Sequence, residues 1–392
     1  MTAPVSRYLA ALRDQTPAML ALLERLVNTD SGSYHAPGVD AVGALLAERL
    51  GALGFSVARQ SIDGRGDQLT ATRTLGGRGR LLILGHLDTV WPAGTVDGWR
   101  FARSDARASG PGVGDMKGGL VMALFALELL LREDLADLAS IRFLLVPDEE
   151  LGSVQSRGWI ESLAADADWA LVLEPARPGG GLVTGRGAVG AVFLDAAGRS
   201  AHAAVNYAKG ASAVHELARM VGVLEALSRS DDGVIVNVGV FRGGAARQVV
   251  PHEAALHLDV RARTAADAER LLADIRTIAA ASADPRVTVS LRGGFTRPAF
   301  PRAAGTVMLY QTAARLAGTL GIPVFETASS GGSDGSFAAA LGVPTLDGMG
   351  PVCHDTCSRD ETIEIASLAE RGAVFAGLIA TLASGSAPAP SS

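Results

Sequence analysis

The chain has 392 residues, of which 48% are hydrophobic and 19% are charged, and its formal net charge at pH 7 is −6. This length exceeds the size at which a single hydrophobic core usually stops growing, so we expect two domains. The negative charge and the lack of Lys/Arg-rich runs argue against nucleic acid or an anionic membrane as the main partner.

The N-terminus, the apolar runs and the two cysteines indicate the cellular compartment of the protein. The N-terminus lacks a basic segment that leads into an uninterrupted apolar stretch, so no secretory signal is predicted. No run reaches the roughly 18 apolar residues of a membrane span. The two cysteines, Cys353 and Cys357, suit a reducing compartment better than a disulfide framework. These features predict a cytoplasmic enzyme without a membrane partner.

The first half of the chain alternates helices and buried strands. Apolar residues at helical spacing predict helices over residues 6–29, 40–53 and 118–132. Apolar runs predict buried strands over residues 81–84, 141–146 and 169–173. This alternation predicts an α/β fold with a mostly parallel sheet that is covered by helices on both faces.

The pattern changes to strand, helix, strand, strand, helix, strand in the middle of the chain. The strands are expected over residues 188–197, 233–241, 254–262 and 286–292, and the helices over 208–229 and 265–282. This order predicts a ferredoxin-like α+β domain inserted into the first domain. We place the insertion at 187–295 and the discontinuous first domain at 1–186 and 296–392.

Five short stretches place metal-type ligands in glycine-rich or strand-end positions. They are Gly85-His86-Leu87-Asp88, Gly112-Val113-Gly114-Asp115-Met116-Lys117-Gly118-Gly119, Asp148-Glu149-Glu150, Glu174-Pro175 and Cys353-His354-Asp355. Three carboxylates (Asp115, Glu150 and Glu174) and two imidazoles would bring about three negative charges to two divalent cations. Ligands after parallel strands share one edge of the sheet. The pattern predicts a two-metal hydrolytic site with a metal-bound hydroxide.

Individual roles follow from the chemistry of these side chains. Glu149 and Glu150 point in different directions, so one can bind metal while the other accepts a proton from water. Asp88 can receive the N–H of the His86 imidazole, and Asp115 can bridge two ions. Solvated loop acids and a structural histidine at a strand end are the ordinary alternatives.

Two other interpretations of these motifs are weaker. The segment 112–119 has the spacing of neither a phosphate-binding nor a dinucleotide-binding loop, so nucleotide binding is not expected. Cys353 and Cys357 have no second cysteine pair with which to form a structural zinc site. We therefore interpret both thiols as incidental and His354 as the fifth metal ligand.

The inserted domain and a late loop supply further candidates. His202 can donate a hydrogen bond to a developing oxyanion, and Arg261 can clamp a substrate carboxylate with two hydrogen bonds. An ordinary surface histidine and an ordinary surface ion pair remain open for these two residues. The segment Gly331-Gly332-Ser333-Asp334 predicts a tight loop near the site.

As a set, these motifs resemble the dinuclear zinc exopeptidase family that includes glutamate carboxypeptidase, aminoacylases and succinyl-diaminopimelate desuccinylase, with the glutamate carboxypeptidase branch closest. The resemblance rests on His-x-Asp-Thr-Val, Gly-x-Gly-Asp-x-Lys-Gly-Gly, Asp-Glu-Glu-x-Gly-Ser, Glu-Pro and Gly-Gly-Ser-Asp. It implies that Asp115 bridges two zinc ions, with cobalt or manganese as alternatives. One ion would be completed by His86 and Glu174, and the other by Glu150 and His354.

The resemblance also implies the roles of residues that do not bind metal. Glu149 corresponds to the general base, and Asp88 to the carboxylate that supports His86. The inserted domain would form a homodimer and supply His202, often across the subunit interface, to polarise the scissile carbonyl. Arg261 corresponds to the arginine that receives the terminal carboxylate of the substrate.

Two departures bear on the substrate. Gln248 stands where relatives commonly carry Asn, so that substrate contact is altered, and Gly332 is expected beside the substrate as well. The stretch 179–183 is apolar where polar groups would be expected for a glutamate side chain. The sequence therefore does not predict glutamate specificity.

Together these features predict a carboxypeptidase-type hydrolase that cleaves the amide bond next to a free carboxylate in a peptide or an N-acyl amino acid. The alternatives on the same scaffold are an N-acyl amino acid deacylase, a dipeptidase and a carbamoyl amidase. A non-catalytic homologue is a further alternative, and it predicts that a ligand or the base is missing. None is missing from the sequence.

Overall fold

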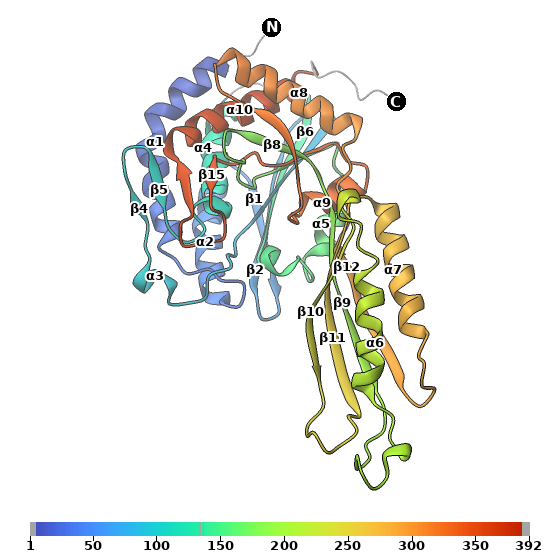
Figure 1. Cartoon of the computed structure of the whole chain (residues 1–392). Helices are drawn as coiled ribbons and strands as arrows, with labels where there is room; N and C mark the ends of the chain where they lie inside the picture. The colour runs from blue at the N-terminus through green and yellow to red at the C-terminus, as the bar shows by residue number, and fades with distance from the viewer. Residues whose placement is uncertain (1–4, 133–134, 136, 386–392) are drawn as a thin grey trace. The chain divides into compact units, whose positions relative to one another are not determined.

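The computed structural model describes residues 5–132, 135 and 137–385. The chain divides into two compact units (Figure 1). Unit 1 comprises Met1–Gly185, Pro301–Ala328 and Ser333–Ser392, and unit 2 comprises Arg186–Phe300 and Ser329–Gly332. The insertion predicted at 187–295 is shorter than unit 2, and the prediction did not assign the loop Ser329–Gly332 to it.

Unit 1 is built around a six-stranded sheet with the order β1-β2-β6-β3-β7-β14. The strands are β1 (Ser56–Ile62), β2 (Gly66–Thr74), β3 (Gly79–His86), β6 (Leu138–Val146), β7 (Trp169–Val172) and β14 (Thr345–Leu346). The last four in this order, from β6 to β14, run parallel, whereas β1 and β2 form an antiparallel hairpin at one edge. The predicted α/β fold with a mostly parallel sheet is confirmed, but the hairpin was not predicted.

Helices cover both faces of this sheet because successive side chains of each strand point to opposite faces. Leu81 and Ile83 pack into one hydrophobic core and Leu82 and Leu84 into another. The first core contains α1 (Val5–Val27), α2 (Ala36–Ala52), α4 (Gly119–Leu130), α8 (Ala304–Thr319) and α10 (Ile365–Ala383). The second contains α5 (Arg157–Ala165) and α9 (Gly335–Ala340). Each fully buried leucine contributes about 1.5–3 kcal/mol to this packing.

Shorter elements complete unit 1. A small sheet has the order β15-β16-β5-β4, and β8 pairs with β13. These strands are β4 (Ala102–Arg103), β5 (Arg107–Ser109), β8 (Gly181–Arg186), β13 (Phe325–Ser329), β15 (Cys353–His354) and β16 (Thr362–Glu364), and α3 (Thr95–Gly98) is a single turn. The small sheet matters because β15 bears the predicted ligand His354.

Helix α10 is long and apolar enough to cross a membrane, with a mean hydropathy of 1.5. Glu370 and Arg371 interrupt the apolar sequence of α10, so it is not a continuous run of about 18 apolar residues. In addition, 72% of the stretch is buried inside the structure. It packs against α1 and α4, with Phe375 and Leu378 fully buried. The apolar composition of α10 is explained by its place in the core of unit 1.

Unit 2 is a four-stranded antiparallel sheet with the order β10-β11-β9-β12. Its elements are β9 (Ala188–Ala197), α6 (Ala213–Glu225), β10 (Ile235–Gly243), β11 (Glu253–Ala262), α7 (Ala265–Ala280) and β12 (Thr288–Arg297). Both helices pack on one face of the sheet (Figure 1). Helix α6 begins later than predicted because the Ser212 side chain accepts the backbone N–H of His215 and caps it. This order and strand arrangement are ferredoxin-like.

Candidate metal centre

The predicted ligands lie where three parallel strands end. His86 is the last residue of β3 and is paired in register with Val146, the last residue of β6. Leu84 of β3 is paired with Val172, the last residue of β7. β3 and β6 therefore end level, β7 ends two residues earlier, and Glu149 and Glu174 follow shortly after β6 and β7. All three polar side chains are buried.

The glycine-rich segment before α4 brings Asp115 to the same place. A β-carbon at Gly119 would lie 2.3 Å from the carbonyl oxygen of Leu173, just after β7. A β-carbon at Gly114 would lie 2.3 Å from Sγ of Cys353. Side chains at these two positions would push the segment away from its neighbours. The glycines thus serve close packing that places Asp115 over the strand ends.

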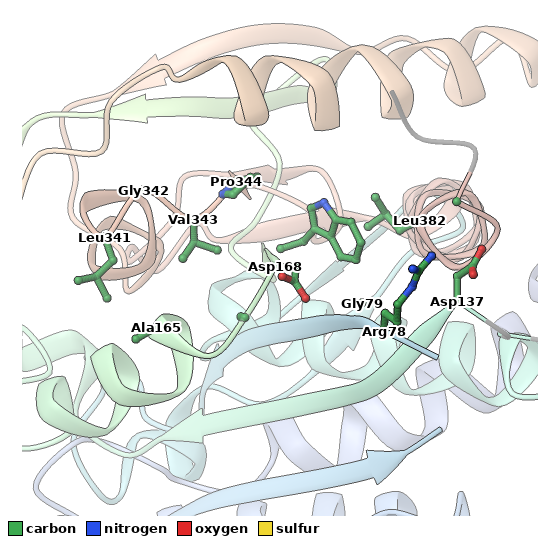
Figure 2. A pocket seen from close by; sticks show the side chains of 13 residues that line it. Arg78, Gly79, Asp137, Ala165, Asp168, Leu341, Gly342, Val343, Pro344 and Leu382 are labelled. Atoms are coloured by element: carbon green, nitrogen blue, oxygen red, sulfur yellow. The ribbon is translucent and has the colours of Figure 1, made fainter. Parts of the chain in front are cut away.

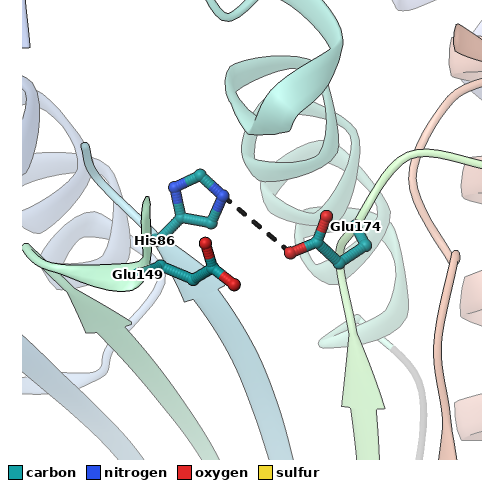
Figure 3. Close-up of side chains that lie close together, drawn as sticks. All are labelled: His86, Glu149 and Glu174. Atoms are coloured by element: carbon teal, nitrogen blue, oxygen red, sulfur yellow. Dashed lines mark ion pairs between the residues drawn. The ribbon is translucent and has the colours of Figure 1, made fainter. Parts of the chain in front are cut away.

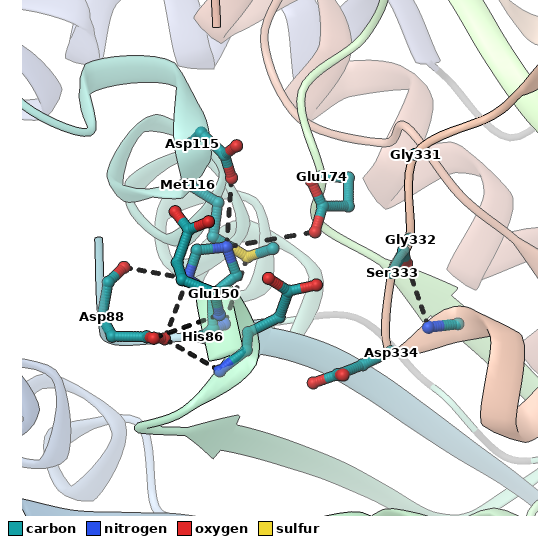
Figure 4. A network of polar contacts seen from close by, with 12 residues as sticks. His86, Asp88, Asp115, Met116, Glu150, Glu174, Gly331, Gly332, Ser333 and Asp334 are labelled. Atoms are coloured by element: carbon teal, nitrogen blue, oxygen red, sulfur yellow. Dashed lines mark hydrogen bonds and ion pairs between the residues drawn. The ribbon is translucent and has the colours of Figure 1, made fainter. Parts of the chain in front are cut away.

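Two groups of possible ligands share His86. One contains His86, Asp115 and Glu150, and the other contains His86, Glu149 and Glu174 (Figure 3). Within each group the ligand atoms lie within 4.8 Å of one another. His86 Nε2 is 3.1 Å from Asp115 Oδ1 and 3.9 Å from Glu174 Oε1 (Figure 4). The structure therefore gathers four of the predicted carboxylates around the imidazole of His86.

Asp88 orients both His86 and the acidic turn. Nδ1 of His86 lies 2.9 Å from the Asp88 backbone oxygen and 3.4 Å from its carboxylate. A proton on Nδ1 leaves the lone pair of Nε2 for a cation. The Asp88 carboxylate accepts hydrogen bonds from Ser33 Oγ at 2.6 Å and from the N–H groups of Glu149 and Glu150 at 3.2 Å. Asp88 thus contacts the imidazole through both its backbone oxygen and its carboxylate.

The donor set fits divalent cations. Burial and then the Asp115 carboxylate raise the pKa of Glu150 and of Glu174 well above its ordinary value. Burial lowers the pKa of His86, but Asp115 and Asp88 outweigh it and raise the value overall. Such a cluster of buried acids repels itself unless cations neutralise it. Imidazole and carboxylate donors suit zinc, and also cobalt or manganese.

Glu361 is a buried carboxylate that sequence analysis missed. Its Oε1 accepts the backbone N–H groups of Gly114 and Asp115 at 2.8 and 3.1 Å, and its Oε2 accepts that of Cys357 at 3.2 Å. Glu361 is 1% exposed, and burial followed by Asp115 raises its pKa to about 7. It fastens the Asp115 segment to the segment after His354.

His354 belongs to neither ligand group found in the described part of the chain. Its Nε2 lies 2.9 Å from Glu364 Oε1 and 3.4 Å from Arg107 Nη2. Its role as the fifth ligand therefore stays a prediction. Cys357 places Sγ 3.5 Å from Asp115 Oδ2, and the interpretation of this thiol as incidental also stays a prediction.

In unit 2, His202 and Gln248 are neighbours. Nδ1 of His202 accepts the backbone N–H groups of Ala204 and Val205 at 3.1 and 3.3 Å. The proton of the neutral ring therefore resides on Nε2, which makes Nε2 a donor. The backbone oxygen of Gln248 accepts the N–H of Ala203 at 2.9 Å. The side chain of His202 is exposed.

Arginines surround the loop of Gly332 in unit 2. Arg261 donates to both carboxylate oxygens of Asp259 at 2.7 and 2.9 Å and to the Ser330 carbonyl at 3.2 Å. Arg186 donates to the Gly332 carbonyl at 3.1 Å. A β-carbon at Gly332 would lie 2.7 Å from the side chain of Arg297. Sequence analysis did not single out Arg186 or Arg297, both of which are buried.

A pocket of about 770 Å³ lies at the other ends of the strands (Figure 2). It is lined by Gly79 and Trp169, the first residues of β3 and β7, and by Pro344. The metal-type ligands follow the last residues of the same strands. This pocket is therefore separate from the candidate metal centre, and none of the predicted site residues lines it.

A mostly parallel α/β sheet that gathers a histidine and several carboxylates at its strand ends suits a metal-dependent peptidase or amidohydrolase. Residues 82–381 match the sequence model of peptidase family M20/M25/M40. The chain belongs to this family, which confirms the predicted resemblance and the predicted enzyme class.

Individual relatives and structures agree with this assignment. Carboxypeptidase G2 from Pseudomonas sp. (strain RS-16) is 30% identical over 383 residues, which cover 96% of this chain and 92% of the relative. Succinyl-diaminopimelate desuccinylase from Xanthomonas oryzae pv. oryzae is 29% identical over 359 residues, which cover 86% of this chain and 93% of the relative. The crystal structure of aminopeptidase PepT from Bacillus cereus has a TM-score of 0.76 at 22% identity, covering 94% of this chain and 99% of that one. The similarity to the PepT structure shows that the two chains share a fold.

The metal-free protein should lose stability as the pH rises from about 5.5 to 7. A carboxyl group whose pKa is raised by folding keeps its proton in the folded state after the unfolded state has released it, so stability falls as the pH rises through this window. Glu361, with its pKa raised to about 7, acts this way, and Glu150, Glu174 and His86 act in the same direction. Thermal unfolding of chelator-treated protein measures the trend. A melting temperature that rises with pH would contradict it, and zinc-loaded protein is the reference.

Proposed function

We propose that this M20-family enzyme is a two-metal hydrolase of the carboxypeptidase type, which cleaves the amide bond next to a free carboxylate. The proposal rests on the group of His86, Asp115, Glu149, Glu150 and Glu174 at the strand ends. Zinc is the proposed metal, with cobalt or manganese as alternatives. When bound, a metal pair activates water and polarises the scissile carbonyl. Asp115 would bridge the pair.

Glu149 is proposed as the general base. It is 7% exposed and lies in one ligand group with His86 and Glu174. Its backbone N–H is held by Asp88 at 3.2 Å, which supports a fixed position for its side chain. Glu149 would take a proton from the attacking water and deliver it to the nitrogen of the leaving amine.

His202 is proposed to donate from Nε2 to the carbonyl oxygen on which negative charge develops. Its tautomer supports this role because Nδ1 already accepts backbone N–H groups. We further propose that unit 2 forms a homodimer in which His202 serves the partner subunit.

Mixing two inactive variants tests this arrangement. In a hybrid dimer of Glu149→Gln and His202→Asn subunits, the His202→Asn subunit keeps its own base and receives an intact His202 from its partner. We expect turnover to return after the two proteins are unfolded and refolded together. Each variant refolded alone is the control. No gain on mixing, with hybrid dimers present by native mass spectrometry, would contradict action across the interface.

Arg261 is proposed to hold the substrate carboxylate. Three of its five N–H donors have partners among the described residues, at Asp259 and Ser330. Two donors are therefore available for a carboxylate in the bidentate geometry that arginine favours. Gln248, beside His202, and Gly332, which makes room for Arg297, are proposed to border the substrate.

Replacing Arg261 by Gln should raise KM for a carboxylate substrate by about 10- to 100-fold, as expected for the loss of a charged hydrogen bond worth 1.5–3 kcal/mol. The same variant should have little effect on the matching carboxamide, since the lost attraction depends on the negative charge. Steady-state kinetics on such a pair measures the difference. Arg276→Gln, on the exposed side of α7, is the matched control. Equal losses on both substrates would contradict the clamp.

The substrate class requires a turnover screen of the metal-loaded protein. The substrates are dipeptides with varied C-terminal residues, N-acyl amino acids, and N-carbamoyl compounds. Hydrolysis of both peptides and N-acyl amino acids, confined to those with a free carboxylate next to the amide, supports the proposal. Hydrolysis of N-acyl amino acids alone, of dipeptides alone or of carbamoyl compounds alone would favour the deacylase, dipeptidase or amidase alternative, and no turnover of any of them would favour a non-catalytic homologue. A cytoplasmic location is proposed as well, and cell fractionation tests it.

A further inference from the structure

The guanidinium group of Arg359 stacks against two tryptophan rings. Its central carbon lies 5.1 Å from the ring centroid of Trp91 and 5.0 Å from that of Trp99. The centroids of the two rings are 4.9 Å apart and the ring planes meet at 80°, so the rings form a corner. Both cation distances are within the roughly 6 Å over which an aromatic face attracts a cation. We call these three residues the Trp–Arg corner.

The Trp–Arg corner lies beside the candidate metal centre because both of its segments come from there. Trp91 follows Asp88 by three residues, which span at most about 11 Å. Arg359 follows Cys357 by two residues, which span at most about 7 Å. Sγ of Cys357 is in turn 3.5 Å from Asp115 Oδ2. All of these residues belong to unit 1.

Hydrogen bonds fix the loop that carries the two tryptophans. The Asp30 carboxylate accepts the backbone N–H groups of Gly94 at 2.6 Å and of Val96 at 3.1 Å. The backbone N–H of Trp99 donates to the carbonyl of Thr95 at 3.0 Å. The rings are therefore in place before a ligand binds, which lowers the entropy cost of using the stacked arginine for binding.

The N–H groups of Arg359 are available to a ligand. A guanidinium carries five N–H donors, which lie in its plane and are not used by stacking on an aromatic face. Within the described ranges of the chain, the side chain of Arg359 forms no hydrogen bond or ion pair, so the two rings are what hold it. Arg359 is exposed, whereas both rings are half-buried. The Trp–Arg corner thus presents a positioned cation with free donors.

We propose that Arg359 binds an acidic group on the acyl part of the substrate. The carboxylate of the leaving amine already has a proposed partner in Arg261, whereas none of the residues proposed to contact the substrate offers a positive charge to the acyl part. The acyl part begins at the scissile carbonyl, which the metal centre binds, and Arg359 lies a few residues from that centre. A carboxylate accepts two parallel hydrogen bonds from a guanidinium.

Two kinds of substrate carry such a group. One has a dicarboxylic acyl group, and the other is a peptide with an acidic residue before the scissile bond. Both present a carboxylate several bonds from the amide. This inference rests on the proposed function and narrows its substrate class to compounds that are acidic on both sides of the amide.

Matched substrate pairs test the inference. N-succinyl amino acids are compared with N-succinamyl amino acids, and glutamyl dipeptides with glutaminyl dipeptides, so that each pair differs by a carboxylate against a carboxamide. For the metal-loaded protein we expect KM to be about tenfold lower for the acid in at least one pair, and that pair identifies the kind of substrate. Arg359→Gln should abolish the difference by raising KM for the acid, with kcat unchanged.

Two further variants serve as controls. Arg315→Gln removes an exposed positive charge from α8 in unit 1 and should keep the preference for the acid. Arg359→Lys keeps the charge without the planar donors and should keep only part of the preference. If Arg359 only staples two loops, Arg359→Gln will lower the melting temperature and change the kinetics of acid and carboxamide equally, which would overturn the inference.

A binding measurement separates the inference from the proposed function. Isothermal titration calorimetry on the Glu149→Gln protein, with and without Arg359→Gln, gives the affinities for both members of each pair without turnover. Hydrolysis with no preference for the acid, or with a preference that Arg359→Gln leaves intact, would overturn the inference and leave the proposed function standing. Tighter binding of the acid that depends on Arg359, without hydrolysis by the unmodified protein, would support the inference and overturn the proposed function.

Discussion

Replacing Glu149 by Gln should reduce kcat by about 10²- to 10⁴-fold, the contribution expected of a general base. Glutamine keeps the size of the side chain but cannot accept the proton of the attacking water. The ligands His86, Asp115 and Glu174 are unchanged, so the variant should still bind its metal ions. Initial rates at saturating substrate, with metal content by atomic emission, measure both effects.

A matched control separates this effect from a general loss of charge. Glu128→Gln removes a carboxylate on α4 that pairs with Arg132 at the surface, and it should leave kcat unchanged. If Glu149→Gln loses its metal together with its activity, then Glu149 acts as a ligand, which its position in one group with His86 and Glu174 allows. Full turnover in the variant would refute the base assignment.

Replacing Asp115 by Asn should have an effect at least as large, because it removes the only residue proposed to contact both ions. An amide offers one neutral oxygen where the carboxylate offers two charged ones. We expect bound metal to fall below two ions per chain and turnover to fall by at least as much as in Glu149→Gln. Metal content after dialysis and kcat under the same conditions measure the result.

Stability provides the control for Asp115→Asn. In metal-free protein, Asp115 raises the pKa of Glu150, Glu174 and Glu361, so the negative charges repel one another. Removing one charge should leave the melting temperature of the metal-free variant equal to or above that of the metal-free parent at neutral pH. A large decrease would mean that the variant loses metal because it misfolds. Unchanged metal content would show that Asp115 does not bridge.

Local patterns predicted the strands on which the site depends. The apolar runs before His86 and before Glu149 are buried on both faces, and this double burial makes them visible as continuous hydrophobic stretches. The hairpin of β1 and β2 was missed because β1 lies at the sheet edge. Most residues of Ser56–Ile62 are exposed, and they show neither a hydrophobic run nor a regular alternation.

The proposed ligands could be selected from the sequence because glycines and strand ends frame them. The residues that hold the ligands could not. Glu361 and Ser33 act through hydrogen bonds to partners far away in the chain, since Gly114 and Glu361 are 247 residues apart. Cys357 was set aside because it lacks a local cysteine partner, whereas its contact with Asp115 depends on the path of the chain after β15.

The bond from Glu361 to the Asp115 segment has a consequence for biosynthesis. Unit 1 is completed only by the last part of the chain, where Glu361 precedes α10, and α10 packs against α1 and α4. While the ribosome is still translating unit 2, the nascent polypeptide already contains His86, Asp115, Glu150 and Glu174 but lacks the carboxylate that holds the Asp115 segment. We therefore expect the Asp115 segment to reach its final position only after Glu361 has left the ribosome.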